Sequence, residues 1–120
     1  MLNIRIEKIG NMAVVECSGR IVRSDAAFQL RDAVMAQRAF DVIVLDLSDV
    51  TAVEGGGLGM LHFLQRWTED NHIQLKLFNP NGPVKRRLQL TDPPPHLEIA
   101  SMGEMIALLA QADQQFAIAA

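Results

Sequence analysis

The sequence has one cysteine, no long apolar run and no surplus of positive charge, and each shortage excludes a class of protein. Cys17 cannot form an intramolecular disulfide, and its place in a strand-like run predicts a small buried hydrophobic residue. No apolar run approaches the roughly 20 residues that span a bilayer, and the first residues carry charges and no signal-peptide core. The net charge of −3 provides no basic field for nucleic acid or anionic lipid. We therefore expect a cytoplasmic protein that neither binds nucleic acid nor inserts into a membrane.

The composition is typical of a globular chain, and the order of the predicted elements places it in the α/β class. Of the 120 residues, 49% are apolar and 21% are charged, which suits one domain, residues 1–120, with one modest core. An opening hairpin followed by alternating helices and strands favours a mixed, mostly parallel β-sheet with about four helices. The expected strands are 4–9, 13–17, 41–47, 73–78 and 97–100, and the expected helices begin at Ser24-Asp25, Leu58, Pro83 and Ser101.

Short signals mark three of the element boundaries. Gly10-Asn11 predicts a two-residue turn in the opening hairpin. Ser24-Asp25 is expected to cap the first helix, because both side chains accept hydrogen bonds from a first helical turn. Ser101, with Glu104 three residues later, predicts a capping box at the start of the last helix.

The segment 42–64 contains the most informative junction, where a buried strand leads through a short loop and three consecutive glycines into an amphipathic helix. Such a junction directs backbone N–H groups and a helix N-terminus outward, where they can hold an anion or present a switch residue. Gly55, Gly56 and Gly57 need a reason, because each glycine in a regular element costs roughly 0.5–1 kcal/mol relative to alanine. Close approach of a partner or a phosphate is one reason, and a loop that requires positive φ is the other. Glu54 is the one charged side chain there; helix capping through its charge is its expected role, and repulsion of a wrong partner is the alternative.

The residues around this junction resemble those of the STAS domain, the fold of anti-sigma factor antagonists, and the similarity covers essentially the whole chain. In that family the third strand ends in Leu-Asp-Leu-Ser, which Leu45 to Ser48 match. A few residues later the family has Asp-Ser-Ser-Gly-Leu-Gly, where this chain has Glu54-Gly55-Gly56-Gly57-Leu58-Gly59. Gly19, just after the predicted second strand, also fits the family pattern.

The resemblance implies a regulatory protein-interaction module of bacterial transcription signalling, but it also reveals a departure. In phosphoregulated members the first serine of the motif is phosphorylated by a partner kinase that is also the anti-sigma factor. Gly55 occupies that position and Gly56 the next, so the usual phosphosite is lost. The resemblance therefore implies a constitutive binder of an anti-sigma factor or related ATPase-fold regulator, or one regulated elsewhere. Ser48 and Thr51 are the nearest hydroxyls for such regulation.

The expected partner surface combines the junction with the outer side of the second helix. Its apolar residues spread over roughly 220°, whereas a helix lying on a sheet needs about 100° or somewhat more, so some apolar area should remain exposed. Met60, Phe63 and Trp67 form the candidate stripe, although burial is the favoured outcome for Trp67. The same stripe is compatible with a homodimer. The predicted partner-binding residues are Glu54, Gly55, Gly56, Gly57, Leu58, Gly59, Met60 and Phe63.

Three other functions are compatible with parts of this sequence to different degrees. Free-standing STAS proteins also serve as subunits of ABC-type phospholipid transport systems, packed on the transporter ATPase subunit, and a lost phosphosite suits that role. A binder of phosphate or a nucleotide is a further alternative, although no P-loop lysine follows the glycines. An enzyme is not expected: an Asp46–Glu54 pair is a minor candidate, and the histidines and Cys17 lack metal-ligand spacing. The basic run 85–87 is expected to be a solvated face, and no cofactor or metal is predicted.

Overall fold

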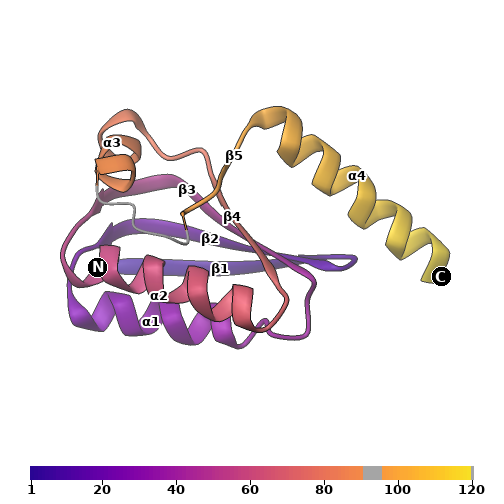
Figure 1. Ribbon diagram of the computed structural model, residues 1–120, viewed down its shortest axis with the longest axis horizontal. Helices are drawn as coiled ribbons and strands as arrows, with labels where there is room; N and C mark the ends of the chain where they lie inside the picture. The colour runs from indigo at the N-terminus through magenta and orange to yellow at the C-terminus, as the bar shows by residue number, and fades with distance from the viewer. Residues whose placement is uncertain (91–95, 120) are drawn as a thin grey trace.

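A mixed β-sheet in the strand order β1-β2-β3-β4-β5 forms the centre of the molecule (Figure 1). The structure, a computed structural model, describes residues 1–90 and 96–119, with side chains described only as far as residue 113. β1 (Leu2–Ile9) pairs antiparallel with β2 (Met12–Ile21). β3 (Val42–Val53), β4 (Gln74–Phe78) and β5 (Ile99–Ala100) extend the sheet in parallel. The predicted mixed, mostly parallel sheet and its opening hairpin are confirmed.

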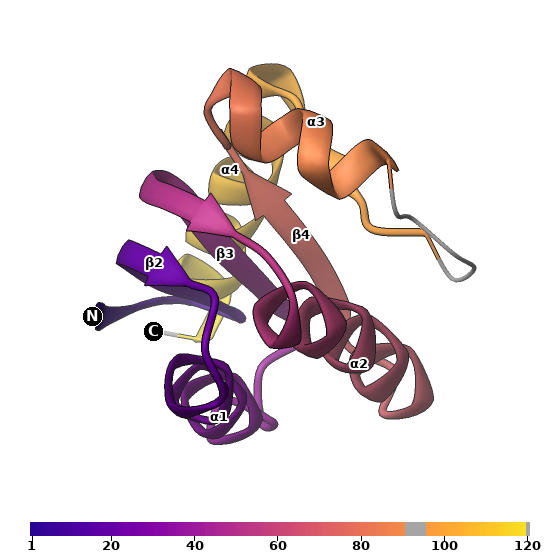
Figure 2. The ribbon, with the colours of Figure 1, turned by 90° about the vertical axis from the view of Figure 1, so that its left-hand side faces the viewer.

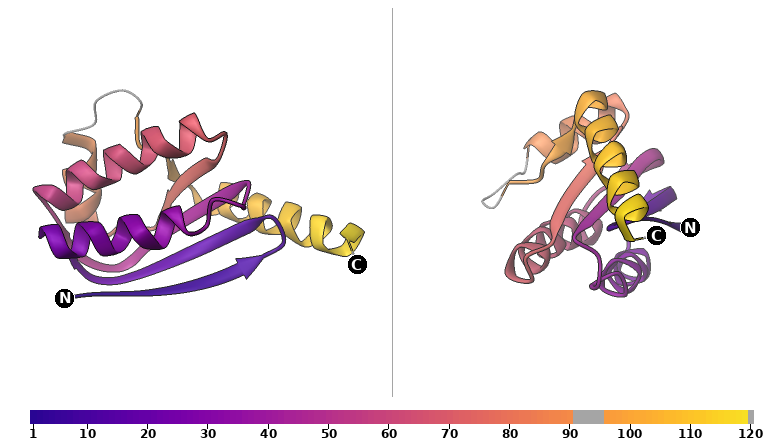
Figure 3. Two further views of the ribbon diagram at one scale, coloured as in Figure 1. Left: turned by 90° about the horizontal axis from the view of Figure 1, so that it is seen from below. Right: turned by 90° about the vertical axis from the view of Figure 1, so that its right-hand side faces the viewer.

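Four helices among the described residues cover the sheet. α1 (Ser24–Met35) and α2 (Gly56–Asp70) lie side by side on one face, as Figure 2 shows. α3 (Gly82–Leu90) packs on the C-terminal part of β3 and contributes to the same core. α4 (Met102–Ala119) lies on the opposite face (Figure 3). The junctions that follow β2 and β3 therefore meet at one end of the sheet, where α1 and α2 begin.

Alternating side chains of β3 divide the interior into two apolar clusters. Ile43 and Leu45 belong to the main core beneath α1 and α2, whereas Val42 and Val44 contact the cluster that includes Met105 of α4. Burial on both faces explains why this stretch is an unbroken apolar run. Further along β3, the side chains on the face that α4 covers become polar, as at Asp46 and Ser48, and this part of that face is not fully buried.

Two strands are longer than their apolar runs predict. β3 continues past Leu47 to Val53, because Val50 and Val53 remain buried in the main core while polar residues alternate with them. β2 likewise continues to Ile21, and its pairing with β3 shifts register twice, between Glu16 and Ser18 and between Gly19 and Arg20. The chain therefore passes from β3 into the glycine junction after a single residue, without the loop expected from sequence.

The two predicted helix caps differ in outcome. The capping box at α4 is confirmed: Glu104 N–H donates to Ser101 Oγ at 3.1 Å, and Ser101 N–H donates to Glu104 Oε1 at 3.2 Å. The cap at Ser24-Asp25 is wrong, because Ser24 is already helical and Arg23 is the N-cap, with no side-chain hydrogen bond. Arg23 keeps the extended backbone of the segment before it, with φ −113° and ψ 162°, which moves the helix start one residue earlier.

Cys17 is buried, as predicted, with 3% of its surface exposed. Burial, with a smaller contribution from the Asp46 carboxylate, raises the pKa of its thiol to about 12. The thiol therefore stays protonated at neutral pH, which removes the nucleophilic form that thiol chemistry needs.

The α4 cap should respond to acid. The hydrogen bond from the Ser101 N–H, helped by the charge of Lys76, holds the pKa of the Glu104 carboxyl below its ordinary value of 4.5. A carboxyl whose pKa is lower in the folded state stabilises that state above the unfolded pKa, and the contribution disappears as pH falls through the folded pKa. We expect a carbon-detected NMR titration to give a Glu104 pKa below 4.5, with first-turn amides of α4 shifting in step. A Glu104→Gln variant should lack that step, and a Glu104 pKa at or above 4.5 would contradict the assignment.

Candidate functional site

The three glycines form a tight turn that joins β3 to α2. The Gly57 N–H donates to the Glu54 carbonyl at 3.0 Å, and the Gly59 N–H donates to the Gly55 carbonyl at 3.1 Å. Gly55 is the N-cap of α2, with φ 54° and ψ −123°. These angles are those of the first central residue of a type II′ turn, a position that favours glycine strongly because a Cβ would be strained there. We call residues 54–57 the glycine turn.

Gly57 has a different reason to be glycine, which is close packing. A Cβ at this position would lie 1.8 Å from the Ile21 carbonyl oxygen and 2.8 Å from Ile21 Cγ2. The same carbonyl accepts the Glu54 N–H at 3.2 Å, so the end of β2 is held directly against the glycine turn. Positive φ, one of the two explanations that the sequence left open, therefore applies to Gly55. Gly57 packs against the backbone of the chain itself, a reason that differs from the approach of a partner or a phosphate.

The predicted partner-binding residues separate into exposed and buried groups. Gly55, Gly56 and Gly59 are exposed, and a Cβ at Gly56 or Gly59 would meet nothing within 4 Å. Phe63 is 48% exposed on α2. Gly57 and Leu58 are buried, and Met60 packs against the main core.

The apolar surplus expected on α2 is smaller than predicted. Trp67 also packs against the main core, as its burial tendency suggested, so Phe63 alone of the candidate stripe is well exposed. The described surface at this site is a nearly side-chain-free patch with one aromatic side chain beside it.

Glu54 forms an ion pair and does not cap α2. Its Oε1 lies 3.3 Å from Arg87 Nη2, and the helix has no side-chain cap. The expectation of capping was wrong because α3 brings Arg87 across to the end of β3, a long-range contact that sequence spacing does not show. Glu54 and Arg87 border a shallow cavity of about 160 Å³ between β3 and α3. Arg87 remains exposed, as do its neighbours in the basic run, so the predicted solvated face is confirmed, with this surface ion pair added.

The other polar groups near the junction are engaged elsewhere. Ser48 N–H donates to Asp46 Oδ1 at 3.0 Å, and Asn79 Nδ2 donates to Ser48 Oγ at 3.1 Å. Thr51 Oγ1 donates to the Gly19 carbonyl at 3.3 Å. Asp46 lies within β3, well before the strand reaches Glu54, so the structure does not bring these two carboxylates together as a catalytic pair.

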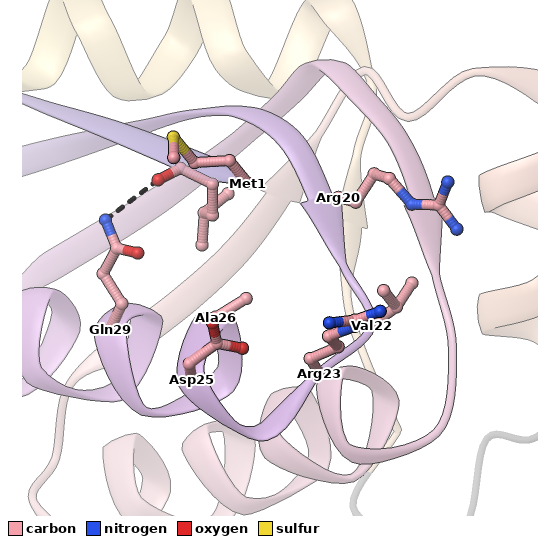
Figure 4. Close-up of a pocket in the computed structure, with 8 residues that line it drawn as sticks. Met1, Arg20, Val22, Arg23, Asp25, Ala26 and Gln29 are labelled. Carbon is pink, nitrogen blue, oxygen red and sulfur yellow. Dashed lines mark hydrogen bonds between the residues drawn. The ribbon is translucent and has the colours of Figure 1, made fainter.

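A larger cavity of about 460 Å³ lies beside the glycine turn, at the start of α1 (Figure 4). We call it the arginine pocket, because Arg20 and Arg23 line it together with Asp25 and Gln29. Gln29 Nε2 donates to the Leu2 carbonyl at 3.0 Å, which ties α1 to β1 along one wall. Sequence reasoning missed this pocket, because two arginines three residues apart at a strand end show no periodic pattern. Its full lining is Met1, Leu2, Arg20, Val22, Arg23, Asp25, Ala26 and Gln29.

The structure was also compared with two other possibilities, a metal site and a membrane-spanning helix. Among the residues that the structure describes, no three His, Cys, Asp or Glu side chains gather as metal ligands. None of the helices in this described part combines the length and the hydropathy of a membrane-spanning segment. His62 is half-buried, and both of its ring nitrogens are buried without a hydrogen-bond partner in the described part of the chain.

Comparison with known proteins decides the family. The family model for the STAS domain matches residues 3–101. The chain belongs to the STAS domain family. No curated protein sequence matched it. The fold predicted from the resemblance is therefore confirmed.

Solved structures with a similar fold include both anti-sigma factor antagonists and an anion transporter. The anti-sigma factor antagonist SpoIIAA in its unphosphorylated form is 18% identical, with a TM-score of 0.72 over 91% of this chain and 97% of that one. An anti-sigma factor antagonist from Mycobacterium paratuberculosis is 22% identical, with a TM-score of 0.70 over 92% and 95% of the two chains. The murine anion transporter Slc26a9 is 19% identical, with a TM-score of 0.65 over 95% of this STAS chain and 19% of the transporter.

The last two glycines of the turn, Gly56 and Gly57, should respond differently to a methyl group. Gly57→Ala should lower the free energy of unfolding by about 1–3 kcal/mol, because its Cβ would overlap a backbone carbonyl. Gly56→Ala, at the exposed first residue of α2, should leave it unchanged or raise it by about 0.4–1 kcal/mol. Urea unfolding followed by circular dichroism measures both variants beside the wild type. Equal midpoints for the two would contradict the packing described for Gly57.

Proposed function

We propose that this STAS domain is a regulatory protein-interaction module that binds an anti-sigma factor or related ATPase-fold regulator without a phosphorylation switch at the glycine turn. The observation that carries the proposal is the backbone of Gly55, with φ 54° and ψ −123°. This residue stands where the resemblance places the phosphoserine. The chain thus lacks the hydroxyl and also holds its backbone in a conformation that a serine adopts only under strain.

The physical effect of a permanent glycine is a surface whose charge is fixed. A phosphoryl group adds about −1.5 to −2 charge at pH 7 and considerable bulk. Neither can be added at Gly55 or Gly56, so binding there is constitutive. Regulation through Ser48 or Thr51 would first have to break the hydrogen bonds that their hydroxyls make with Asn79 and Gly19.

The exposed residues suit contact with a protein surface. Gly56 and Gly59 allow a partner backbone to approach closely, because no side chain stands between. Phe63 offers an aromatic anchor at the edge of this patch, and aromatic side chains are enriched in interface cores. Arg87 orients the Glu54 carboxylate beside the turn, which fixes one charge for the partner to match.

We further propose that the module acts by binding in the cytoplasm and catalyses no reaction. Among the described residues at the turn, the carboxylate of Glu54 has an arginine for a partner and no nucleophile beside it. A phosphate-binding role is less favoured, because the N–H groups of Gly57 and Gly59 already donate to backbone carbonyls and Glu54 would repel an anion.

A second candidate is the STAS subunit of an ABC-type phospholipid transport system, bound to the transporter ATPase subunit. Its support is the missing hydroxyl, which suits a permanent subunit, and the similar fold within part of the anion transporter Slc26a9. The two candidates share a constitutive protein contact and differ in the partner.

Affinity capture from the cells of origin tests the proposal with a matched pair of variants. Gly56→Glu places bulk and charge on the turn at a position where an added Cβ would meet nothing within 4 Å. Gly103→Glu makes the same change near the exposed start of α4. We expect mass spectrometry to identify an anti-sigma factor or kinase-type ATPase with wild type and Gly103→Glu, reduced at least about tenfold with Gly56→Glu, a loss of about 1.4 kcal/mol.

The other outcomes of the capture are equally decisive. A transporter ATPase subunit with the same dependence on Gly56 would replace the first candidate by the second. A partner that binds all three proteins equally would show that the glycine turn is not the interface.

A further inference from the structure

We propose that the arginine pocket receives an acidic side chain from the protein that covers the glycine turn. This inference rests on the proposed function and adds the chemistry of the partner: an Asp- or Glu-bearing segment beside the surface that meets Gly56. Its basis is the charge inside the cavity, the open start of α1, and the continuity of the pocket with the turn.

The charges of the pocket are unbalanced. Arg20 and Arg23 contribute two guanidinium groups, whereas Asp25 contributes one carboxylate. Within the described residues, neither arginine forms an ion pair or a side-chain hydrogen bond, although Arg5, Arg31 and Arg87 all do. Figure 4 shows both arginines at the same end of the cavity. A chain of net charge −3 therefore has a locally basic cavity.

Backbone donors add to this imbalance. Arg23, as the N-cap of α1, supplies no side-chain acceptor to the first helical turn, and its carbonyl accepts the Ala27 N–H at 2.9 Å. Unpaired N–H groups at a helix start favour a negative group. A carboxylate that enters the pocket would find guanidinium and backbone donors together, and Arg–carboxylate hydrogen bonds are among the strongest polar contacts.

The pocket and the glycine turn form one continuous surface. Val22 lines the pocket, and its carbonyl oxygen would lie 3.8 Å from a Cβ at Gly55. The preceding residue, Ile21, accepts the Glu54 N–H, so the two sites are fixed relative to each other by backbone contacts. One partner surface can therefore cover the turn and place a side chain in the pocket.

The size and lining of the cavity favour a protein side chain over a small anion. A volume of about 460 Å³ lies in the range of sites that hold ligands much larger than a single phosphate. Asp25 within the lining would also repel a dianion more than a monovalent carboxylate.

An acidic peptide tests the inference without the unidentified partner. The probe is acetylated, amidated tetraglutamate, titrated into ¹⁵N-labelled full-length protein at low salt, with tetraglutamine and inorganic phosphate as parallel arms. We expect saturable shifts of the Val22, Arg23 and Ala26 amides with tetraglutamate. The double variant Arg20→Gln and Arg23→Gln should weaken the affinity about tenfold or more, in keeping with lost charge-assisted hydrogen bonds. The charge-matched control is Arg38→Gln with Arg66→Gln, which changes two exposed arginines outside the pocket and should preserve the binding.

Each remaining outcome overturns the inference. Absence of shifts, shifts that map elsewhere, or equal weakening by the control variant would remove the pocket as an acidic site. Phosphate binding as tight as tetraglutamate would make it a simple anion site and exclude the assignment to a protein side chain. Failure of the proposed function is distinguishable, because it appears in the Gly56→Glu capture and leaves the peptide titration unaffected.

Discussion

The contact between the end of β2 and the start of α2 is the constraint on which the site depends. The Ile21 carbonyl accepts the Glu54 N–H and also occupies the space where Gly57 would carry a Cβ. This contact joins two crossover connections that are more than thirty residues apart in the chain. It therefore sets the distance between the glycine turn and the arginine pocket, and a side chain at Gly57 would disturb both.

Much of the fold follows from local sequence, and most of the site does not. The apolar run of β3 and the Ser101–Glu104 pair predicted their elements because burial on both faces and a capping box are local signals. The extension of β3 to Val53 was missed, because its alternating polar residues are read correctly only when the neighbouring strand is known. The ion pair of Glu54 with Arg87 and the pocket at Arg23 depend on contacts between elements, which spacing along the chain does not encode.

The departure from the phosphoregulated STAS pattern involves the backbone as well as the side chain. If only the hydroxyl were missing, a single substitution would restore it. Because Gly55 has φ 54° and ψ −123°, a serine there would also have to change the turn that starts α2. Glycine at position 55 permits this backbone conformation, and the conformation in turn disfavours a serine there. The chain therefore differs from the serine-bearing members that it resembles in both residue and backbone.

The burial of Cys17 has a practical consequence for following this protein in solution. A thiol that is 3% exposed, with a pKa near 12, is inert toward alkylating dyes in the folded protein. A cysteine introduced at an exposed position such as Gly59 or Phe63 would then be the one accessible thiol of the chain, since the sequence has no other. The wild-type sequence is thus ready for single-site fluorescent labelling next to the glycine turn, with no need to replace its native cysteine.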